Sequence, residues 1–219
     1  MSDHSYAGEK LTIHFDPKKC IHAGECVKGN AAVFNPNNKP WVAPDATSAD
    51  EIVQVVERCP TGALTYERHD GGAAETAAAA NTVHIAPDGP VYLRGDLRIE
   101  GSNGEEITAT RVALCRCGAS KNAPFCDRAH TEAEFKDGGA VGEAKTKEAP
   151  EGQSFLKARV LPDGPVLLEG PYELFDGSEA SCLNTGSGYL CRCGASSNKP
   201  WCDGTHGKVG YKEAGEVKG

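Results

Sequence analysis

The stretch CRCGASKNAPFCDRAH, which runs from Cys115 to His130, recurs as CRCGASSNKPWCDGTH from Cys191 to His206. Both copies keep three cysteines, one proline and one histidine at the same positions. We call these stretches the first motif and the second motif. Thiolate sulfur and imidazole nitrogen are ligands that suit both zinc and iron–sulfur centres. Each motif therefore predicts a metal centre of its own.

The spacing within a motif indicates how the ligands are shared. Cys115 and Cys117 are two residues apart, so both sulfurs can reach one metal from an extended loop, and Gly118 allows a sharp turn after them. Cys126 and His130 are four residues apart, one helical turn, and can face a second metal. One tetrahedral zinc could also use all four ligands. Zinc sites usually contain Cys-x-x-Cys, however, and Cys-x-Cys suits zinc poorly.

The repetition extends beyond the motifs. PDGPVYLRGDLRI, which starts at Pro87, matches PDGPVLLEGPYEL, which starts at Pro162, and Phe135 and Tyr211 each lie five residues after a motif histidine. Each repeat predicts a turn, several strands, the metal loop and a short helical turn. A single repeat is too short to bury a core, but two packed face to face could bury one.

The first 70 residues differ from the repeats. LTIHF (11–15) alternates like a strand, TSADEIVQVVERC (47–59) has helical periodicity with Ser48 or Thr47 as its cap, and ALTYER (63–68) predicts a closing strand. The helix residues predicted to face inward are Ile52, Val55 and Val56. The low-complexity stretch HDGGAAETAAAAN then predicts a linker.

These patterns predict an α+β chain with an N-terminal domain followed by two small β-rich modules. The expected limits are 10–68 for the N-terminal domain, 69–81 for a linker, 82–136 for the first module, 137–153 for a second linker and 154–214 for the second module.

Composition narrows the classes of function. The net charge of −8 argues against a nucleic-acid binder, and there is neither an apolar run of membrane-spanning length nor an N-terminal signal pattern. We therefore expect a soluble cytoplasmic protein without membrane or nucleic-acid partners. Disulfides rarely persist in the cytoplasm, so the ten cysteines favour metal binding.

Both motifs fit the pattern C-x-C-x2-S-x3-P-x-C-D-x-[AT]-H, which resembles the CDGSH (NEET) iron–sulfur family. The resemblance implies one [2Fe–2S] cluster per motif, held by three cysteines and one histidine. The implied ligands are Cys115, Cys117, Cys126 and His130 in the first motif, and Cys191, Cys193, Cys202 and His206 in the second. Two fused copies imply an internal pseudo-dimer and hence a monomer in solution. Arg128 departs from the family, which usually has glycine there.

A third constellation lies in KKCIHAGECV and ERCPTGAL. A one-cluster ferredoxin usually has the ligand pattern C-x2-C-x2-C and a remote Cys-Pro. Here Cys20 and Cys26 stand at the outer positions and Cys59-Pro60 at the remote one, whereas Ala23 replaces the middle cysteine. Three thiolates suit a [3Fe–4S] cluster. Residues 10–68 resemble the divergent single-cluster bacterial ferredoxins. His22 could bind a fourth iron, which would give [4Fe–4S], or could form a hydrogen bond near the cluster.

The expected function is electron transfer or redox sensing through three clusters, with a redox protein as partner. The alternative is a cluster donor or iron-homeostasis factor that acts on apo-proteins. No nucleophile–base or phosphate-binding pattern indicates an enzyme. Several residues outside these sites also carry chemistry-bearing side chains. We expect Cys182 to be a buried or half-exposed free thiol, and Trp41 and Trp201 to be packing residues. The histidines expected to be ordinary surface or strand residues are His4, His14, His69 and His84.

Overall fold

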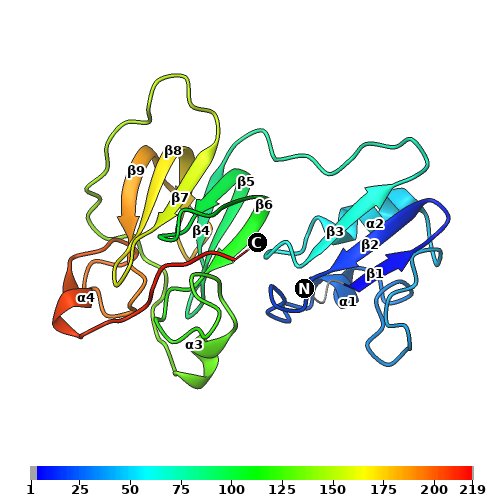
Figure 1. Cartoon of the computed structure of the whole chain (residues 1–219), viewed down its shortest axis with the longest axis horizontal. Helices are drawn as coiled ribbons and strands as arrows, with labels where there is room; N and C mark the ends of the chain where they lie inside the picture. The colour runs from blue at the N-terminus through cyan, green and yellow to red at the C-terminus, as the bar shows by residue number, and fades with distance from the viewer. Residues whose placement is uncertain (1–3, 219) are drawn as a thin grey trace. The chain divides into compact units, whose positions relative to one another are not determined.

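A computed structural model describes residues 4–218 of the chain. The chain divides into two compact units, whose described parts are residues 4–76 and 77–218. Figure 1 shows both units as mixtures of strands with few and mostly short helices. The α+β, strand-rich class expected from the sequence is therefore confirmed.

The N-terminal unit is built on a three-stranded antiparallel sheet in the order β1-β2-β3. Its elements are β1 (His4–Ala7), β2 (Leu11–Phe15), α1 (Glu25–Gly29), α2 (Ala49–Val56) and β3 (Leu64–Arg68). The strands at LTIHF and ALTYER are confirmed. Neither β1 nor α1 was predicted, since each is too short to show a clear periodicity.

Helix α2 begins where the sequence places its cap. The Ser48 side chain accepts a hydrogen bond from the backbone N–H of Glu51, and the Glu51 carboxylate accepts one from the Ser48 backbone. Ile52, Val55 and Val56 are buried in the core of this unit, as predicted. Burial of each such side chain contributes about 1.5–3 kcal/mol, so this apolar face fixes α2 in the unit.

The C-terminal unit contains a six-stranded sheet and two one-turn helices. Its elements are β4 (Thr82–Ile85), β5 (Val91–Glu100), β6 (Glu106–Leu114), α3 (Ala129–Glu132), β7 (Leu156–Val160), β8 (Val166–Phe175), β9 (Ser181–Leu190) and α4 (Thr205–Lys208). The strands after each PDGP turn, the strands that lead into the motifs and the short helical turns after them are all confirmed.

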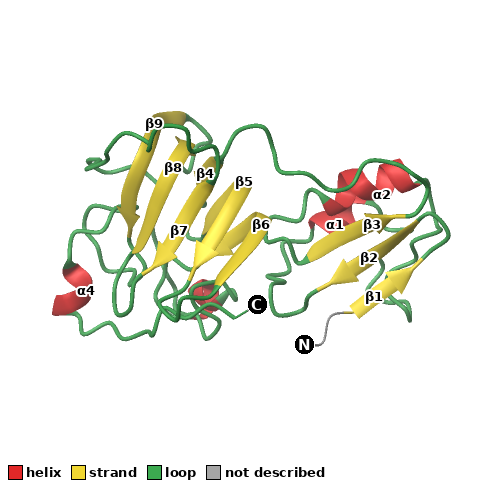
Figure 2. Cartoon of the chain, turned by 45° about the horizontal axis from the view of Figure 1, so that its top comes forward, coloured by secondary structure: helices red, strands yellow, loops and turns green. Residues whose placement is uncertain are grey.

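The two repeats are joined through their first strands. Strand β4 pairs antiparallel with β5 and parallel with β8, whereas β7 pairs antiparallel with β8 and parallel with β5. Thr82 lies opposite Glu173, and Lys157, 75 positions after Thr82, lies opposite Arg98. Figure 2 shows β4 and β7 end to end between β5 and β8. The repeats therefore share one hydrogen-bonded sheet through β4 and β7, and their face-to-face packing stays a prediction.

Both repeats contribute to one hydrophobic core. It contains Val83, Leu93 and Leu97 from the first repeat and Leu156, Leu168 and Leu174 from the second, all nearly inaccessible to solvent. A core shared in this way supplies the burial that one repeat could not achieve alone. Among residues 4–218, no helix is long and apolar enough to cross a membrane.

Candidate metal centres

The first motif folds back on the strand that precedes it. Leu114, the last residue of β6, forms an antiparallel bridge with Phe125. The backbone N–H of Cys115 donates to the carbonyl of Pro124 at 2.8 Å, and that of Cys126 donates to the carbonyl of Ala113 at 2.8 Å. This short hairpin places the two ends of the motif side by side and buries both Cys115 and Cys126.

The second motif has the same backbone arrangement at the end of β9. Leu190 bridges to Trp201, and the backbone N–H of Cys191 donates to the carbonyl of Pro200 at 2.7 Å. Cys202 donates its backbone N–H to the carbonyl of Tyr189 at 2.7 Å. Trp201 is buried and packs in the core, as predicted. The repeated sequence therefore encodes a repeated loop geometry.

A serine and an aspartate hold each loop. In the first motif, the Ser120 hydroxyl donates to the Phe125 carbonyl at 2.7 Å. The Asp127 carboxylate accepts the backbone N–H groups of Lys121, at 2.8 Å, and Ala129, at 3.0 Å. Ser196 and Asp203 make the equivalent bonds in the second motif. These bonds satisfy several backbone groups of the loop and restrain its shape.

The predicted ligands lie in close pairs. The Sγ atoms of Cys115 and Cys117 are 3.6 Å apart, and those of Cys191 and Cys193 are 3.8 Å apart. Two sulfurs bound to one tetrahedral metal at about 2.3 Å would lie about 3.8 Å apart, so both spacings fit a shared metal. In the first motif the Cys126 Sγ is 3.5 Å from the His130 Nδ1.

The histidines of the two motifs differ. His130 faces Cys126, whereas the Nδ1 of His206 lies 2.8 Å from the backbone carbonyl oxygen of Asp163, in the PDGP turn of its own repeat. Both imidazoles are half-buried. In the described part of the chain, no three histidine, cysteine, aspartate or glutamate side chains lie close enough together to hold one metal ion.

The pKa values of the paired thiols bear on whether the pairs can bind a metal. Cys115 and Cys117 share one hydrogen bond, which lowers the pKa of the Cys115 thiol and raises the pKa of the Cys117 thiol. Burial raises the pKa of Cys191 to about 11. Two thiolates this close repel one another, so a pair loses both protons only when a cation neutralises it. The donor set therefore fits a metal-containing group.

In the sequence of each motif, one arginine separates the paired cysteines, and this arginine is buried. Arg116 is 1% exposed and donates to the backbone carbonyls of Ala86, at 2.6 Å, and Gly89, at 2.9 Å, and to the carboxylate of Asp137. Its guanidinium lies 5.0 Å from the Phe135 ring centroid. These contacts attach the cysteine pair to the PDGP turn and to the segment after the motif.

Arg192 repeats this arrangement in the second motif. It is 1% exposed, donates to the carbonyls of Leu161, at 2.7 Å, and Gly164, at 2.9 Å, and pairs with Glu213. Tyr211 takes the place of Phe135. Our interpretation of the sequence missed both arginines, although the signal was present, because the same residue stands between both cysteine pairs.

Arg128 adopts the conformation for which glycine is suited. Its φ is +72°, and Gly204, at the same place in the second motif, has a φ of +85°. The left-handed region costs a residue with a side chain about 1–2 kcal/mol. The departure from the family pattern therefore leaves the turn intact and makes it more strained in the first motif than in the second.

We expect Arg128→Gly to raise the free energy of unfolding of the C-terminal unit by about 0.5–1 kcal/mol, because relief of the left-handed strain exceeds the added flexibility of glycine. The reciprocal change Gly204→Arg should lower it by a similar amount, since a Cβ at Gly204 meets no atom within 4 Å and only the backbone cost differs. Urea denaturation of both variants measures the two effects. Equal stability of all three proteins would contradict the prediction.

The N-terminal cysteines face one cavity of about 580 Å³. Cys20 precedes α1, Cys26 lies within it, and Cys59 follows α2, so three separate segments converge there. Burial, followed by weaker repulsion from Cys59, raises the pKa of both Cys20 and Cys26. A cation is again needed to hold the three thiolates together, which fits a metal cluster in this cavity.

His22 and Ala23 also line this cavity. The His22 backbone has a φ of +53°, which is uncommon for a residue with a side chain. Trp41 lies at the cavity and packs edge to face on Phe15, with ring centroids 5.0 Å apart, which confirms its packing role. The lining is mainly apolar around the three sulfurs and gives a cluster a low-dielectric environment.

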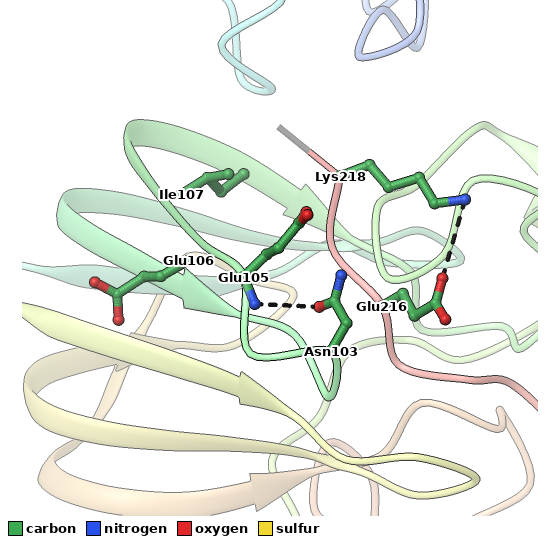
Figure 3. A pocket seen from close by; sticks show the side chains of 6 residues that line it. All are labelled: Asn103, Glu105, Glu106, Ile107, Glu216 and Lys218. Atoms are coloured by element: carbon green, nitrogen blue, oxygen red, sulfur yellow. Dashed lines mark hydrogen bonds and ion pairs between the residues drawn. The ribbon is translucent and has the colours of Figure 1, made fainter.

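A second cavity, of about 710 Å³, lies away from the predicted ligands and is shown in Figure 3. Its lining residues are Asn103, Glu105, Glu106, Ile107, Glu216 and Lys218.

Cys182 is exposed on β9, which corrects the expectation of a buried or half-exposed thiol. His4, His14 and His84 lie in strands and His69 is exposed, as predicted.

Comparison with known proteins bears on all three sites. Residues 6–69 match the family described as divergent 4Fe-4S mono-cluster, and residues 88–131 and 163–207 match the family described as iron-binding zinc finger, CDGSH type. Two curated relatives, both called uncharacterized protein YjdI, come from Escherichia coli K12 and O157:H7. Each is 45% identical over 64 residues, which cover 29% of this chain and 83% of the relative. No solved structure matches the chain.

The fold, the paired thiols and these matches together define an iron–sulfur protein. Through its N-terminal part the chain belongs to the divergent 4Fe-4S mono-cluster family, and it carries two domains of the iron-binding CDGSH type.

Proposed function

We propose that the protein carries electrons, or senses redox state, through three iron–sulfur clusters. The observation that supports this most directly is the pairing of ligands, with Cys115 and Cys117 3.6 Å apart and Cys126 and His130 3.5 Å apart. Two pairs match a cluster of two irons, each iron with two protein ligands. As ligands, the half-buried histidines would leave one edge of each cluster near solvent, where a partner protein can approach.

We propose three sets of ligands. Cys115, Cys117, Cys126 and His130 hold the first [2Fe–2S] cluster, Cys191, Cys193, Cys202 and His206 hold the second, and Cys20, Cys26 and Cys59 hold an N-terminal [3Fe–4S] cluster. The clusters supply the one-electron chemistry when bound. The chain positions them and sets their potentials through ligand type, hydrogen bonds and burial. We propose no catalytic reaction of the chain itself.

We also propose that the limits 10–68, 82–136 and 154–214 mark a ferredoxin-like domain and two modules that form an internal pseudo-dimer. The recurrence of strand pairings 75 residues apart supports the pseudo-dimer. It leads us to expect a monomer, because β4 and β7 of one chain already fill the places between β5 and β8. Light scattering should return the mass of one 23.0 kDa chain. A stable dimer at micromolar concentration would contradict this prediction.

For the N-terminal site we expect the electron paramagnetic resonance (EPR) signal of an oxidised [3Fe–4S] cluster in anaerobically isolated protein, because Ala23 supplies no ligand for a fourth iron. Iron and sulfide counts should accompany the spectrum. The competing outcome is a [4Fe–4S] cluster with His22 as its fourth ligand, because His22 also lines the cavity and the family's description names a 4Fe-4S cluster. A stable [4Fe–4S] cluster that His22→Ala converts to [3Fe–4S] would show that His22 is the fourth ligand.

The second candidate function is donation of clusters to apo-proteins. It is favoured by the same half-buried histidines, since a neutral imidazole near solvent is a ligand that an acceptor's thiolate can displace. Two measurements on the same preparation separate the functions. A carrier passes through repeated reduction and oxidation with its clusters retained. A donor transfers iron and sulfide to apo-ferredoxin faster than the clusters decay in buffer.

The proposed partners are a redox protein for the carrier and an apo-protein for the donor, and the proposed location is the cytoplasm. The acidic net charge suits a partner with a basic docking face. If so, association should weaken as salt concentration rises.

A further inference from the structure

The loops of the two motifs touch each other at equivalent points. A Cβ built at Gly118 would lie 2.6 Å from the backbone carbonyl oxygen of Cys193, and one built at Gly194 would lie 2.5 Å from that of Cys117. Real Cβ atoms do not approach backbone this closely. Both glycines are also left-handed, with φ of +79° and +77°. The contact therefore requires glycine on both sides.

The residues in contact are adjacent to, or identical with, proposed iron ligands. Cys117 and Cys193 are the second cysteines of their pairs, and each is followed directly by the glycine that meets the other loop. Backbone of one ligand-bearing loop thus packs on backbone of the other, with the contact reciprocal. No part of the proposed pairing of ligands within a motif requires this contact between motifs.

A charged link joins the motifs a second time. Lys199 of the second motif places its Nζ 3.8 Å from the Asp137 carboxylate, which also accepts a hydrogen bond from Arg116 of the first motif. The side chains of Lys199 and Asp137 are 18% and 17% exposed, so solvent screens this link only in part. In the first motif, Ala123 stands at the position of Lys199. The ion pair between the motifs is therefore not repeated by an equivalent lysine of the first motif.

We infer that the two C-terminal clusters act as one coupled pair and exchange an electron through the touching loops. This inference rests on the proposed function. In the exchange, the reduced cluster of one motif loses one electron and the oxidised cluster of the other gains it. The electrons enter singly from a one-electron protein carrier. An electron that enters at either motif becomes available at the other, and the unit holds two electrons when fully reduced.

The test uses the full chain with Cys20→Ser and Cys59→Ser, which remove the N-terminal cluster and its signal. Iron and sulfide counts first establish two [2Fe–2S] clusters per chain. EPR spectra are then recorded after one and after two electrons per chain. We expect the two-electron spectrum to show splitting or broadening from interacting spins that the one-electron spectrum lacks. A two-electron spectrum that only doubles the one-electron intensity would overturn the inference.

Glycine variants locate the path. Gly118→Ala and Gly194→Ala should push the loops apart and remove most of the splitting while both clusters stay bound. Gly104→Ala is the matched control, since its φ is also +79° but a Cβ there meets no atom within 4 Å. Splitting unchanged in both loop variants would overturn the assignment to these loops. Absence of [2Fe–2S] clusters from the parent chain would instead contradict the proposed function, so the two failures are distinguishable.

Discussion

Replacement of Arg116 by methionine is expected to lower the free energy of unfolding of the C-terminal unit by about 3 kcal/mol, the lower end of the cost of breaking a buried ion pair. The variant removes a guanidinium that is 1% exposed and that donates to two backbone carbonyls and to the Asp137 carboxylate, which keeps only the Gly139 N–H and the more distant Lys199. The lower end applies because the Asp137 side chain is 17% exposed and recovers some hydration. Arg192→Met should behave alike through Glu213.

The measurement needs a probe confined to this unit. In a Trp41→Phe background, Trp201 is the remaining tryptophan, and it is buried in the C-terminal core. Its fluorescence in urea therefore reports unfolding of that unit. Arg159→Met is the control, since the Arg159 side chain is 41% exposed and its surface ion pairs contribute at most about 1 kcal/mol.

Two further variants separate charge from shape. Arg116→Lys keeps the cation but cannot donate along the planar fork to Ala86, Gly89 and Asp137 together, so an intermediate loss is expected. Asp137→Leu combined with Arg116→Met removes the carboxylate that has lost its arginine and should recover part of the loss. If Arg116→Met costs no more than Arg159→Met, the buried pair does not stabilise the unit as we argue.

Arg116→Met should also weaken cluster binding at the first motif. Arg116 is bonded covalently to both Cys115 and Cys117, and its side chain fixes the loop against the PDGP turn. Without that attachment the sulfurs lose their fixed spacing, and the cluster should dissociate faster than in Arg159→Met.

The sequence predicted the parts of this fold that depend on local patterns. Helix α2 follows from Ser48 and the periodicity of Ile52, Val55 and Val56, because a capping residue and an apolar face act within a few residues. The matching offsets of the repeats predicted two equivalent loops, and both form the same hairpin. The ligand assignments themselves remain predictions.

The parts that sequence could not supply depend on contacts between distant segments. TVHI at 82–85 is too short to be told from a linker, and its pairing with β8 joins residues about 90 positions apart. Arg116 belongs to a residue type that is mostly exposed, and only the fold brings the Ala86 and Gly89 carbonyls to it. The Gly118 contact with Cys193 likewise depends on how the repeats assemble.

Replacement of the proposed ligand histidines by cysteine is expected to make the two proposed C-terminal clusters more resistant to acid. A free imidazole has a pKa of about 6.5, so in mild acid a proton competes with iron for a neutral ligand. A thiolate is a charged, softer ligand that iron holds more strongly. His130→Cys and His206→Cys should each retain a cluster whose half-life near pH 6 is about tenfold longer, equivalent to about 1.4 kcal/mol added to the barrier for cluster loss.

The same change should alter the dependence of the potential on pH. Imidazole binds iron through one nitrogen and leaves the other able to exchange a proton. If one proton accompanies one electron, the potential of the parent sites falls by about 59 mV per pH unit. Thiolate adds negative charge and has no second titrating nitrogen. The variants should therefore show lower potentials and a flatter slope.

Protein-film voltammetry from acid to alkaline pH measures the slope, and cluster absorbance followed in mild acid measures the loss. His84→Gln is the control, because His84 lies in β4 of the same unit, stacked on Phe175 and outside both motifs. It should match the parent in both measurements. If the double variant of His130 and His206 kept the parent's slope and acid lability, the protons would act elsewhere.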